Sequence, residues 1–141
     1  MRHTQAQLVD YWTRLRGSRP IPTISDLETR EIEANWPDSI LLRCRAGSDA
    51  LQPEQTFRGL SNPEPSWPPS GEEADGVELS PLMLQWLLSL AQEVVSDGVP
   101  VQDGEAFPGK RRAIRYHGVA LPFGEDQSKI DHVLCHVRRE G

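Results

Sequence analysis

The side chains best suited to binding a metal or moving a proton gather near the C-terminal end of the chain, where His132, Cys135 and His136 lie close together. In an extended strand, His132 and His136 share one face but stand about 13 Å apart, too far for one metal ion, and Cys135 faces the other way. His117 would reach them only from a neighbouring strand. The three histidines, His117, His132 and His136, are explained equally well as ordinary surface residues, so we predict no metal site.

Catalytic signatures are absent from the sequence. The glycines occur singly, and neither the Gly-x-Ser-x-Gly turn of hydrolases nor the Gly-x-Gly-x-x-Gly loop of dinucleotide-binding proteins is present. The acidic pair Glu72 and Glu73 falls in a segment expected to be flexible, which cannot hold carboxylates at a catalytic spacing. We therefore predict no catalytic residue and expect that the protein is not an enzyme.

Length and hydropathy favour a single domain of residues 1–141, of which 37% are hydrophobic. The longest nearly apolar stretch, residues 82–90, is far shorter than the ~20 residues of a membrane span, and no apolar signal sequence follows Arg2. We expect a cytoplasmic protein without a membrane span. Its cysteines, Cys44 and Cys135, are expected to be reduced and buried.

The net charge of −6 is unevenly distributed along the chain. Residues 46–106 hold 11 acidic side chains and 1 basic one. Because phosphate neutralisation by Lys and Arg supplies most non-specific nucleic-acid affinity, this balance argues against a nucleic-acid partner. We interpret the basic cluster at residues 110–112 as a solvated hairpin turn, in preference to a contact for an anion or an acidic partner.

The elements that must position these residues begin with an amphipathic helix over residues 5–16. Thr4 and Gln7 have the spacing of a capping box, and Gly17 suits the left-handed residue that ends a helix. Apolar side chains recur along one face of this helix at Leu8, Tyr11, Trp12 and Leu15.

The middle of the chain predicts a short helix, a strand and a long loop. Ser25 and Glu28 repeat the capping-box spacing, and the helix that they open should end before Pro37. Residues 40–45 are apolar at first and then alternate, which is typical of a strand that leaves a buried position. Residues 61–76 contain four prolines, two glycines and four acidic side chains but only two apolar ones, and predict a Pro-rich flexible loop.

Ser80 and Pro81 begin a long helix, and Gly98 ends it. Its apolar residues cover an arc of about 240°, which predicts that the helix is covered on more than one side. The residues near the middle of that arc should be the most buried; they are Met83, Leu87, Leu90 and Val94.

Three antiparallel strands are predicted after this helix, at residues 99–107, 112–123 and 130–139, with a hairpin loop at residues 122–127. Together with the earlier elements they predict an α+β fold, in which helices pack on an antiparallel sheet. In the second of these strands, one face carries Ile114, Tyr116, Gly118 and Ala120, and the other carries Arg115, His117, Val119 and Leu121.

Aromatic, proline and glycine positions across most of the chain form a further pattern. They are Tyr11-Trp12-Thr13-Arg14-Leu15-Arg16-Gly17, then Pro22, Ile24, Leu27, Pro37 and Ile40-Leu41-Leu42, and later Phe57-Arg58-Gly59, Val99-Pro100 and Tyr116 through Pro122. Together they resemble a bacterial family of short PAS-like sensory domains. The resemblance implies a five-stranded antiparallel sheet with an N-terminal helix and a long connecting helix, whose concave face holds a small ligand or none.

The resemblance also implies a sensory or regulatory function that uses a small ligand and protein contacts. A ligand-free protein-interaction adaptor on the same fold is the alternative, because residues 61–76 replace the short helices that usually wall the cavity. The cofactor stays unknown; haem bound by one histidine is an option, since some PAS domains bind haem. A ligand pocket in this fold is expected to be lined by Leu41, Phe57, Met83, Trp86, Leu87, Leu90 and Tyr116.

The apolar stripe of the N-terminal helix is too hydrophobic to face water. A second copy of the chain would cover it in a symmetric dimer, whereas folding back onto its own sheet, at Val119 and Leu121, is the alternative. A protein signalling partner is expected too, since no effector segment occurs in the 141 residues. We predict a homodimer or partner interface at Leu8, Tyr11, Trp12 and Leu15.

Overall fold

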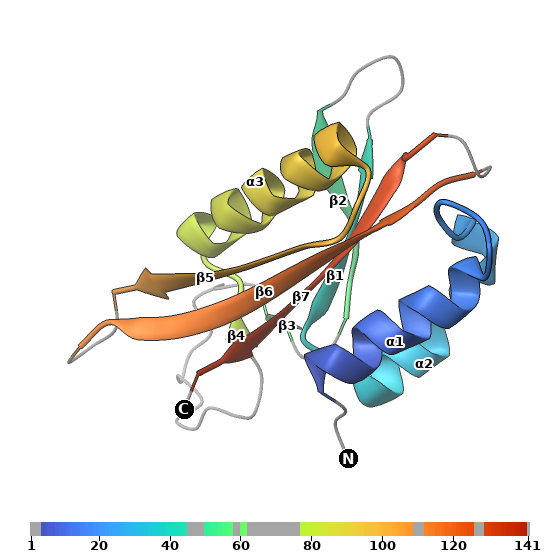
Figure 1. The fold of residues 1–141 in the computed structure, drawn as a ribbon. Coiled ribbons are helices and arrows are strands. Elements are labelled where there is room, and N and C mark those ends of the chain that lie inside the picture. Colours follow the sequence, from blue (N-terminus) through green and yellow to red (C-terminus); the bar gives the residue numbers. More distant parts are fainter. Residues whose placement is uncertain are drawn as a thin grey trace.

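The structure, a computed structural model, describes residues 4–44, 50–57, 60–61, 77–108, 112–125 and 129–140. Five strands form one antiparallel sheet in the order β2-β1-β7-β6-β5, and Figure 1 shows α3 on one face and α1 with α2 on the other. The predicted α+β class and five-stranded antiparallel sheet are confirmed. The strands are β1 (Ser39–Cys44), β2 (Leu51–Thr56), β5 (Val101–Phe107), β6 (Ile114–Phe123) and β7 (His132–Arg139).

Helix α1 (Gln5–Arg16) begins and ends as its sequence predicts. The backbone N–H of Gln7 donates to Thr4 Oγ1 at 3.1 Å, and the Thr4 N–H donates to Gln7 Oε1 at 2.7 Å. These reciprocal bonds satisfy donors that the first helical turn leaves unpaired. At the other end, Gly17 has a φ of 58°, which side chains with a Cβ rarely adopt.

The second capping box lies two residues earlier than predicted. Asp26, not Glu28, accepts the backbone N–H of Thr23 at 3.2 Å, and it closes a single 3-10 turn, η1 (Ile24–Asp26). Arg19 adds a 2.8 Å ion pair to the same carboxylate. The hydrogen bond from the Thr23 side chain, followed by that from Arg19, lowers the pKa of Asp26. Helix α2 (Thr29–Asn35) follows and ends before Pro37, as predicted.

Helix α3 (Pro81–Asp97) has the predicted caps. Ser80 Oγ accepts the Met83 N–H at 3.1 Å, and Gly98 takes a left-handed conformation with φ 77°. The four residues predicted to be most buried are all at most 2% exposed, whereas Leu82 is 53% exposed. Among the described residues, one face of α3 packs on the sheet, and the expected cover on a second side is not found at Leu82. No described helix, α3 included, is long and apolar enough to cross a membrane.

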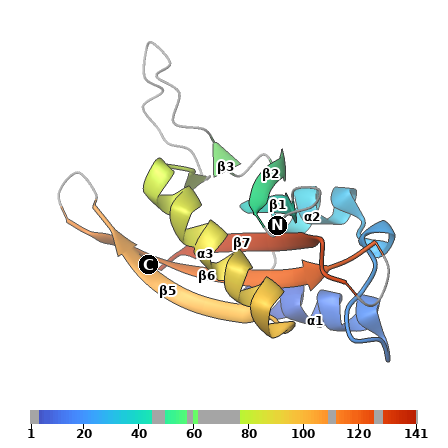
Figure 2. The ribbon, with the colours of Figure 1, turned by 90° about the horizontal axis from the view of Figure 1, so that it is seen from above.

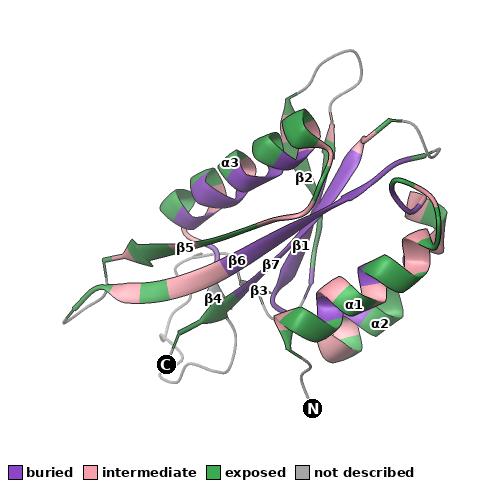
Figure 3. Cartoon of the chain, viewed as in Figure 1, coloured by how far each residue is buried: buried purple, intermediate pink, exposed green. Residues whose placement is uncertain are grey.

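The sheet separates two hydrophobic cores, and its central strands are buried (Figure 3). Side chains alternate between the two sides along β6 and β7, as the period of two predicts. On the α3 side lie Ala120, Val133, Cys135 and Val137, and on the α1 side lie Val119, Leu121 and Leu134.

The hairpin loop between β6 and β7 begins later than predicted, after Phe123, and β7 begins at His132 instead of at residue 130. Pro122 pairs with Val133 and Phe123 with His132, so both Pro122 and Phe123 belong to β6 and not to the loop. At the other end, the β5–β6 ribbon extends beyond α3, as Figures 1 and 2 show.

A two-stranded parallel pair, β3 (Leu60–Ser61) and β4 (Val77–Glu78), lies apart from the main sheet. Leu60 pairs with Val77 and Ser61 with Glu78. This pairing brings together the two ends of the segment between them. The flexible loop predicted at residues 61–76 lies, apart from Ser61, outside the described residues.

Candidate functional site

Five of the predicted pocket residues lie between α3 and the sheet: Met83, Trp86, Leu87 and Leu90 from the helix and Tyr116 from β6. A row of aromatic rings closes one end of this layer. The Trp86 and Phe107 ring centroids are 5.5 Å apart, and those of Phe107 and Tyr116 are 5.9 Å apart. The Trp86 indole N–H donates to Asp103 Oδ2 at 3.4 Å.

Beside Gly118, the space beneath α3 is filled by the helix's own side chains. A Cβ atom placed on Gly118 of β6 would lie 2.9 Å from Cη2 of Trp86 and 3.0 Å from Cδ1 of Leu90. Atoms that close leave no room for a further group between helix and strand. The absence of a side chain at position 118 is thus what admits the indole.

The other two predicted pocket residues lie on the opposite face of the sheet. Leu41 pairs with Leu134 in the sheet, and Leu41 and Phe57 both belong to the core beneath α1 and α2. The predicted seven-residue pocket is therefore wrong as one site, since the sheet separates Leu41 and Phe57 from the remaining five.

The apolar stripe of α1 packs on its own sheet, which was the alternative to a dimer. Leu8 is 0% and Trp12 5% exposed, and both belong to the core that contains Val119 and Leu121. The Trp12 indole N–H donates to the carbonyl of Pro122 at 2.8 Å. Leu8 and Trp12 are covered by their own chain, so the structure corrects the predicted homodimer interface at these two residues.

The remaining two stripe residues, Tyr11 and Leu15, are partly buried at the border of the same core. The Tyr11 hydroxyl accepts the Glu28 N–H at 3.1 Å, and its ring centroid lies 5.4 Å from that of Trp36. Burial raises the pKa of Tyr11, although the hydrogen bond from Glu28 acts in the opposite direction. Tyr11 therefore ties α1 to the start of α2.

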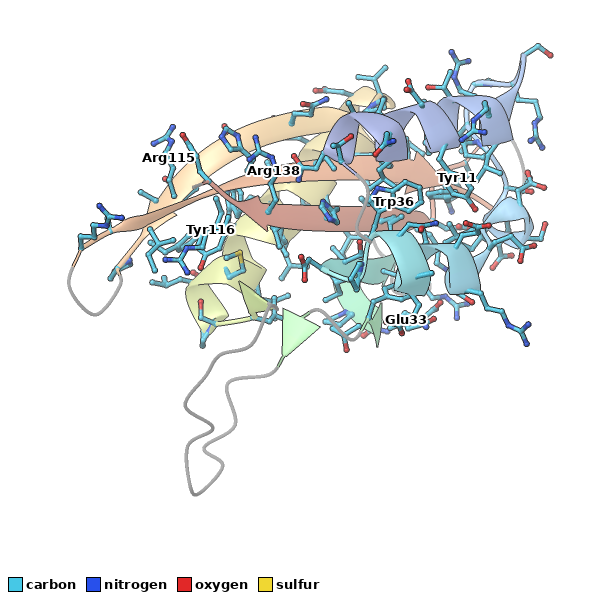
Figure 4. The ribbon with its side chains drawn as sticks, turned by 90° about the horizontal axis from the view of Figure 1, so that it is seen from below. Tyr11, Glu33, Trp36, Arg115, Tyr116 and Arg138 are labelled. Atoms are coloured by element: carbon cyan, nitrogen blue, oxygen red, sulfur yellow. The ribbon has the colours of Figure 1, made fainter. Side chains whose placement is uncertain are left out.

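An open groove of about 520 Å³ follows the line between α1 and α2. Figure 4 shows Tyr11 and Trp36 where the two helices meet. The groove carries side chains of both charge signs, so it does not select one sign of ligand. Its lining residues are Gln7, Asp10, Thr13, Arg14 and Trp36.

The expectation of three surface histidines is wrong for His132 and His136, which are 4% and 5% exposed. His132 lies between two carboxylates: its Nδ1 is 2.6 Å from Asp131 Oδ1, and its Nε2 is 3.5 Å from Glu54 Oε1. Asp131 also accepts the backbone N–H of Glu125 at 2.9 Å. A carboxylate at each ring nitrogen fixes the orientation of the imidazole.

Glu54 reaches His132 because of a β-bulge in β2. Leu41 pairs with Gln55 but Leu42 pairs with Pro53, so Glu54 is the extra residue. A bulge re-aims side chains, and here the carboxylate extends across β1 towards β7. Arg43 of β1 pairs with His132, so the two side chains share one face of the sheet. The next residue, Cys44, therefore points to the opposite face. The cluster thus links β2 to β7 across β1 and brings no thiol to the imidazole.

At the other end of β7, Gln5 holds two strands together. Its amide nitrogen lies 3.0 Å from the carbonyl oxygen of His117, 3.0 Å from His136 Nδ1 and 3.3 Å from the His136 carbonyl oxygen. Gln5 is the first residue of α1, so this contact fixes where the helix begins on the sheet. His136 is buried beneath that contact, which the sequence pattern did not reveal.

Beyond the start of α1, one face of the sheet is exposed and basic (Figure 4). Arg115 and His117 alternate along β6, and Arg138 of β7 pairs with His117, so the three side chains share this face. The Glu140 carboxylate lies 3.3 Å from Arg115 Nε and 3.0 Å from His117 Nε2. We call Arg115, His117 and Arg138 the cationic surface.

The described residues contain no group of three or more His, Cys, Asp or Glu side chains that could hold a metal ion. Both cysteines are free; Cys135 is buried as predicted, whereas Cys44 is partly exposed. Burial raises the pKa of the Cys135 thiol to about 12, and its sulfur lies 3.9 Å from the carbonyl oxygen of Leu87. The buried thiol is therefore protonated near neutral pH and unsuited to nucleophilic chemistry.

No protein-family model, curated protein or solved structure matches this chain. The functional assignment therefore depends on the geometry described above. Sequence patterns placed Arg115 and His117 on one face but did not identify Gln5, Glu54 or Glu140. These three residues act through contacts between segments far apart in the chain, for which a single sequence carries no periodic signal.

Proposed function

We propose that the chain is a non-enzymatic regulatory domain on a PAS-like fold, which acts through contacts with another protein. The resemblance to short bacterial PAS-like domains supports this proposal. So does the arrangement of the elements, because a long helix connects β2 to β5 of a five-stranded antiparallel sheet and a further helix precedes β1. Both features are ones that the resemblance implies.

The contact between Trp86 and Gly118 is the observation that distinguishes a ligand sensor from a ligand-free adaptor. In a sensor, the layer between the long helix and the sheet would leave space for a small molecule. Here the indole occupies that layer, and a single added Cβ at position 118 would approach it to 2.9 Å. The filled layer favours the adaptor, in which regulation depends on the outer surface.

Thermal unfolding tests this proposal. A molecule that binds only the folded state raises the melting temperature by mass action. We expect that neither haem nor any member of a library of small metabolites raises the melting temperature of the purified protein. A metabolite or haem that raises it in a concentration-dependent way would instead support the ligand-binding sensor.

A further inference from the structure

The cationic surface already holds a carboxylate from its own chain. Glu140 Oε2 contacts both Arg115 and His117, although the three side chains are between 36% and 58% exposed. Exposed ion pairs are individually weak, so this carboxylate can be displaced by another. Arg115 and His117 are therefore placed so that one carboxylate oxygen can contact the guanidinium and the imidazole together.

Arg138 gives the surface a cation that no described residue neutralises. Its side chain is exposed, and it makes no ion pair or hydrogen bond with any described residue. It pairs with His117 across β6 and β7, so it lies on the same face as Arg115. A guanidinium presents several donors in a plane and binds carboxylates in a defined orientation.

Small residues on the neighbouring edge strand β5 leave this face accessible. Gly104 pairs with His117, and Ala106 pairs with Arg115. A Cβ at Gly104 would lie 3.4 Å from Nη2 of Arg115 and 3.5 Å from Nδ1 of His117, so both side chains lie directly over the glycine. The Arg115 and His117 side chains thus lie over small residues of β5, and no bulky side chain of these paired positions covers them.

We propose that the cationic surface binds a carboxylate-rich segment of a partner protein, and that Glu140 occupies the surface until this segment displaces it. The inference rests on the proposed function, since it names the chemistry of the protein contact. The net charge of −6 opposes any polyanion at long range, so the local contacts decide between a carboxylate and a phosphate. Carboxylate is the group that the pair Arg115 and His117 already binds.

Fluorescence anisotropy with a short, fluorescein-labelled oligoglutamate peptide tests the proposal at low ionic strength. Removing the free guanidinium in Arg138→Ala should weaken binding about fivefold. Removing the internal competitor in Glu140→Gln should strengthen it by a similar factor. Arg30→Ala removes an equal charge from the exposed surface of α2 and should leave the affinity unchanged. The Arg138 side chain makes no ion pair or hydrogen bond with a described residue, so the melting temperature of Arg138→Ala should match that of the wild type.

Several results would overturn the assignment. One is an unchanged affinity for oligoglutamate in Arg138→Ala, and another is no gain in that affinity in Glu140→Gln. A matched oligoglutamine peptide that binds as tightly as oligoglutamate would also overturn it. So would a phosphopeptide or single-stranded DNA that binds more tightly than oligoglutamate. The proposed function fails separately. A small molecule that raises the melting temperature contradicts it whatever the peptide does, whereas failure of the peptide alone contradicts only this surface.

Discussion

The indole of Trp86 lies directly against Gly118, so that a Cβ atom at position 118 would be 2.9 Å from Cη2 of the ring. One residue is on the helix and the other on the central part of the long strand β6, and the contact joins the two layers of the core. A glycine in the middle of a strand contributes no packing of its own and often marks such a close approach. The contact explains why glycine stands at position 118.

Gly118→Ala should therefore destabilise the fold. The added methyl group forces Trp86 or Leu90 to move, and overpacking of this kind costs about 1–3 kcal/mol. Urea unfolding measures the loss. Gly104→Ala is the matched control in the neighbouring strand, where the new Cβ meets its nearest atom at 3.4 Å. That variant should change the unfolding free energy by less than about 1 kcal/mol, and an equal loss in both would contradict the packing account.

Leu8→Ala should destabilise the monomer. Leu8 is fully buried under α1, and removing a buried leucine side chain costs about 2–5 kcal/mol. Leu15→Ala should cost less, because Leu15 is only partly buried. Denaturant unfolding compares the two. If Leu8→Asp instead converted a stable dimer into a well-folded monomer, the packing of α1 on its own sheet would be wrong.

Trp12→Phe should destabilise the protein although the aromatic ring is kept. The substitution removes the N–H that donates to the Pro122 carbonyl at 2.8 Å in the interior. A buried acceptor left without its donor costs about 1–3 kcal/mol. The change should appear as a lower denaturation midpoint with an unchanged denaturant slope. An unaltered midpoint would mean that water or another group satisfies this carbonyl.

Alkaline pH should weaken the fold through Cys135. Burial raises the pKa of its thiol to about 12, against 9.0 for a free thiol. Below the unfolded value both states hold the proton and stability is complete. As pH rises above that value, the unfolded chain releases the proton first, so stability falls, by at most about 1.4 kcal/mol per pH unit, until the folded pKa is reached.

Cys135→Ala isolates this effect. We expect the variant to lose less unfolding free energy than the wild type between about pH 8 and about pH 10. Urea unfolding at the two pH values measures the change in unfolding free energy of each protein. Other titrating groups, such as Tyr11, contribute equally to this change in both proteins. Equal losses would show that the thiol titrates normally in the folded state.

The local elements could be predicted from the sequence because their signals lie within a few residues. Thr4 and Gln7 cap α1, Ser80 and Gly98 bound α3, and the alternation in β6 and β7 assigns side chains to the correct faces. Each signal depends only on backbone geometry and on the polar groups at the ends of an element.

The predictions failed where the register or the docking of distant elements decides the outcome. Leu41 faces the α1 core because it pairs with Leu134, a register that no local pattern specifies. His136 alternates correctly but is buried because Gln5 and the first turn of α1 cover it. Asp26 displaced Glu28 as the capping residue, since Arg19 and Thr23 both converge on its carboxylate.

Trp86 occupies the space that a ligand would need between α3 and Gly118 of the sheet. The most direct test is thermal unfolding of the wild type and of Trp86→Ala, each with and without indole. Trp86→Ala should lose about 3–5 kcal/mol of stability, and indole should restore part of its melting temperature by entering the new cavity. Leu8→Ala, with a smaller cavity beneath α1, is the control that should not respond. Indole should leave the melting temperature of the wild type unchanged. An equal rise in the wild type, or no rise in Trp86→Ala, would show that Trp86 does not fill a ligand-sized space.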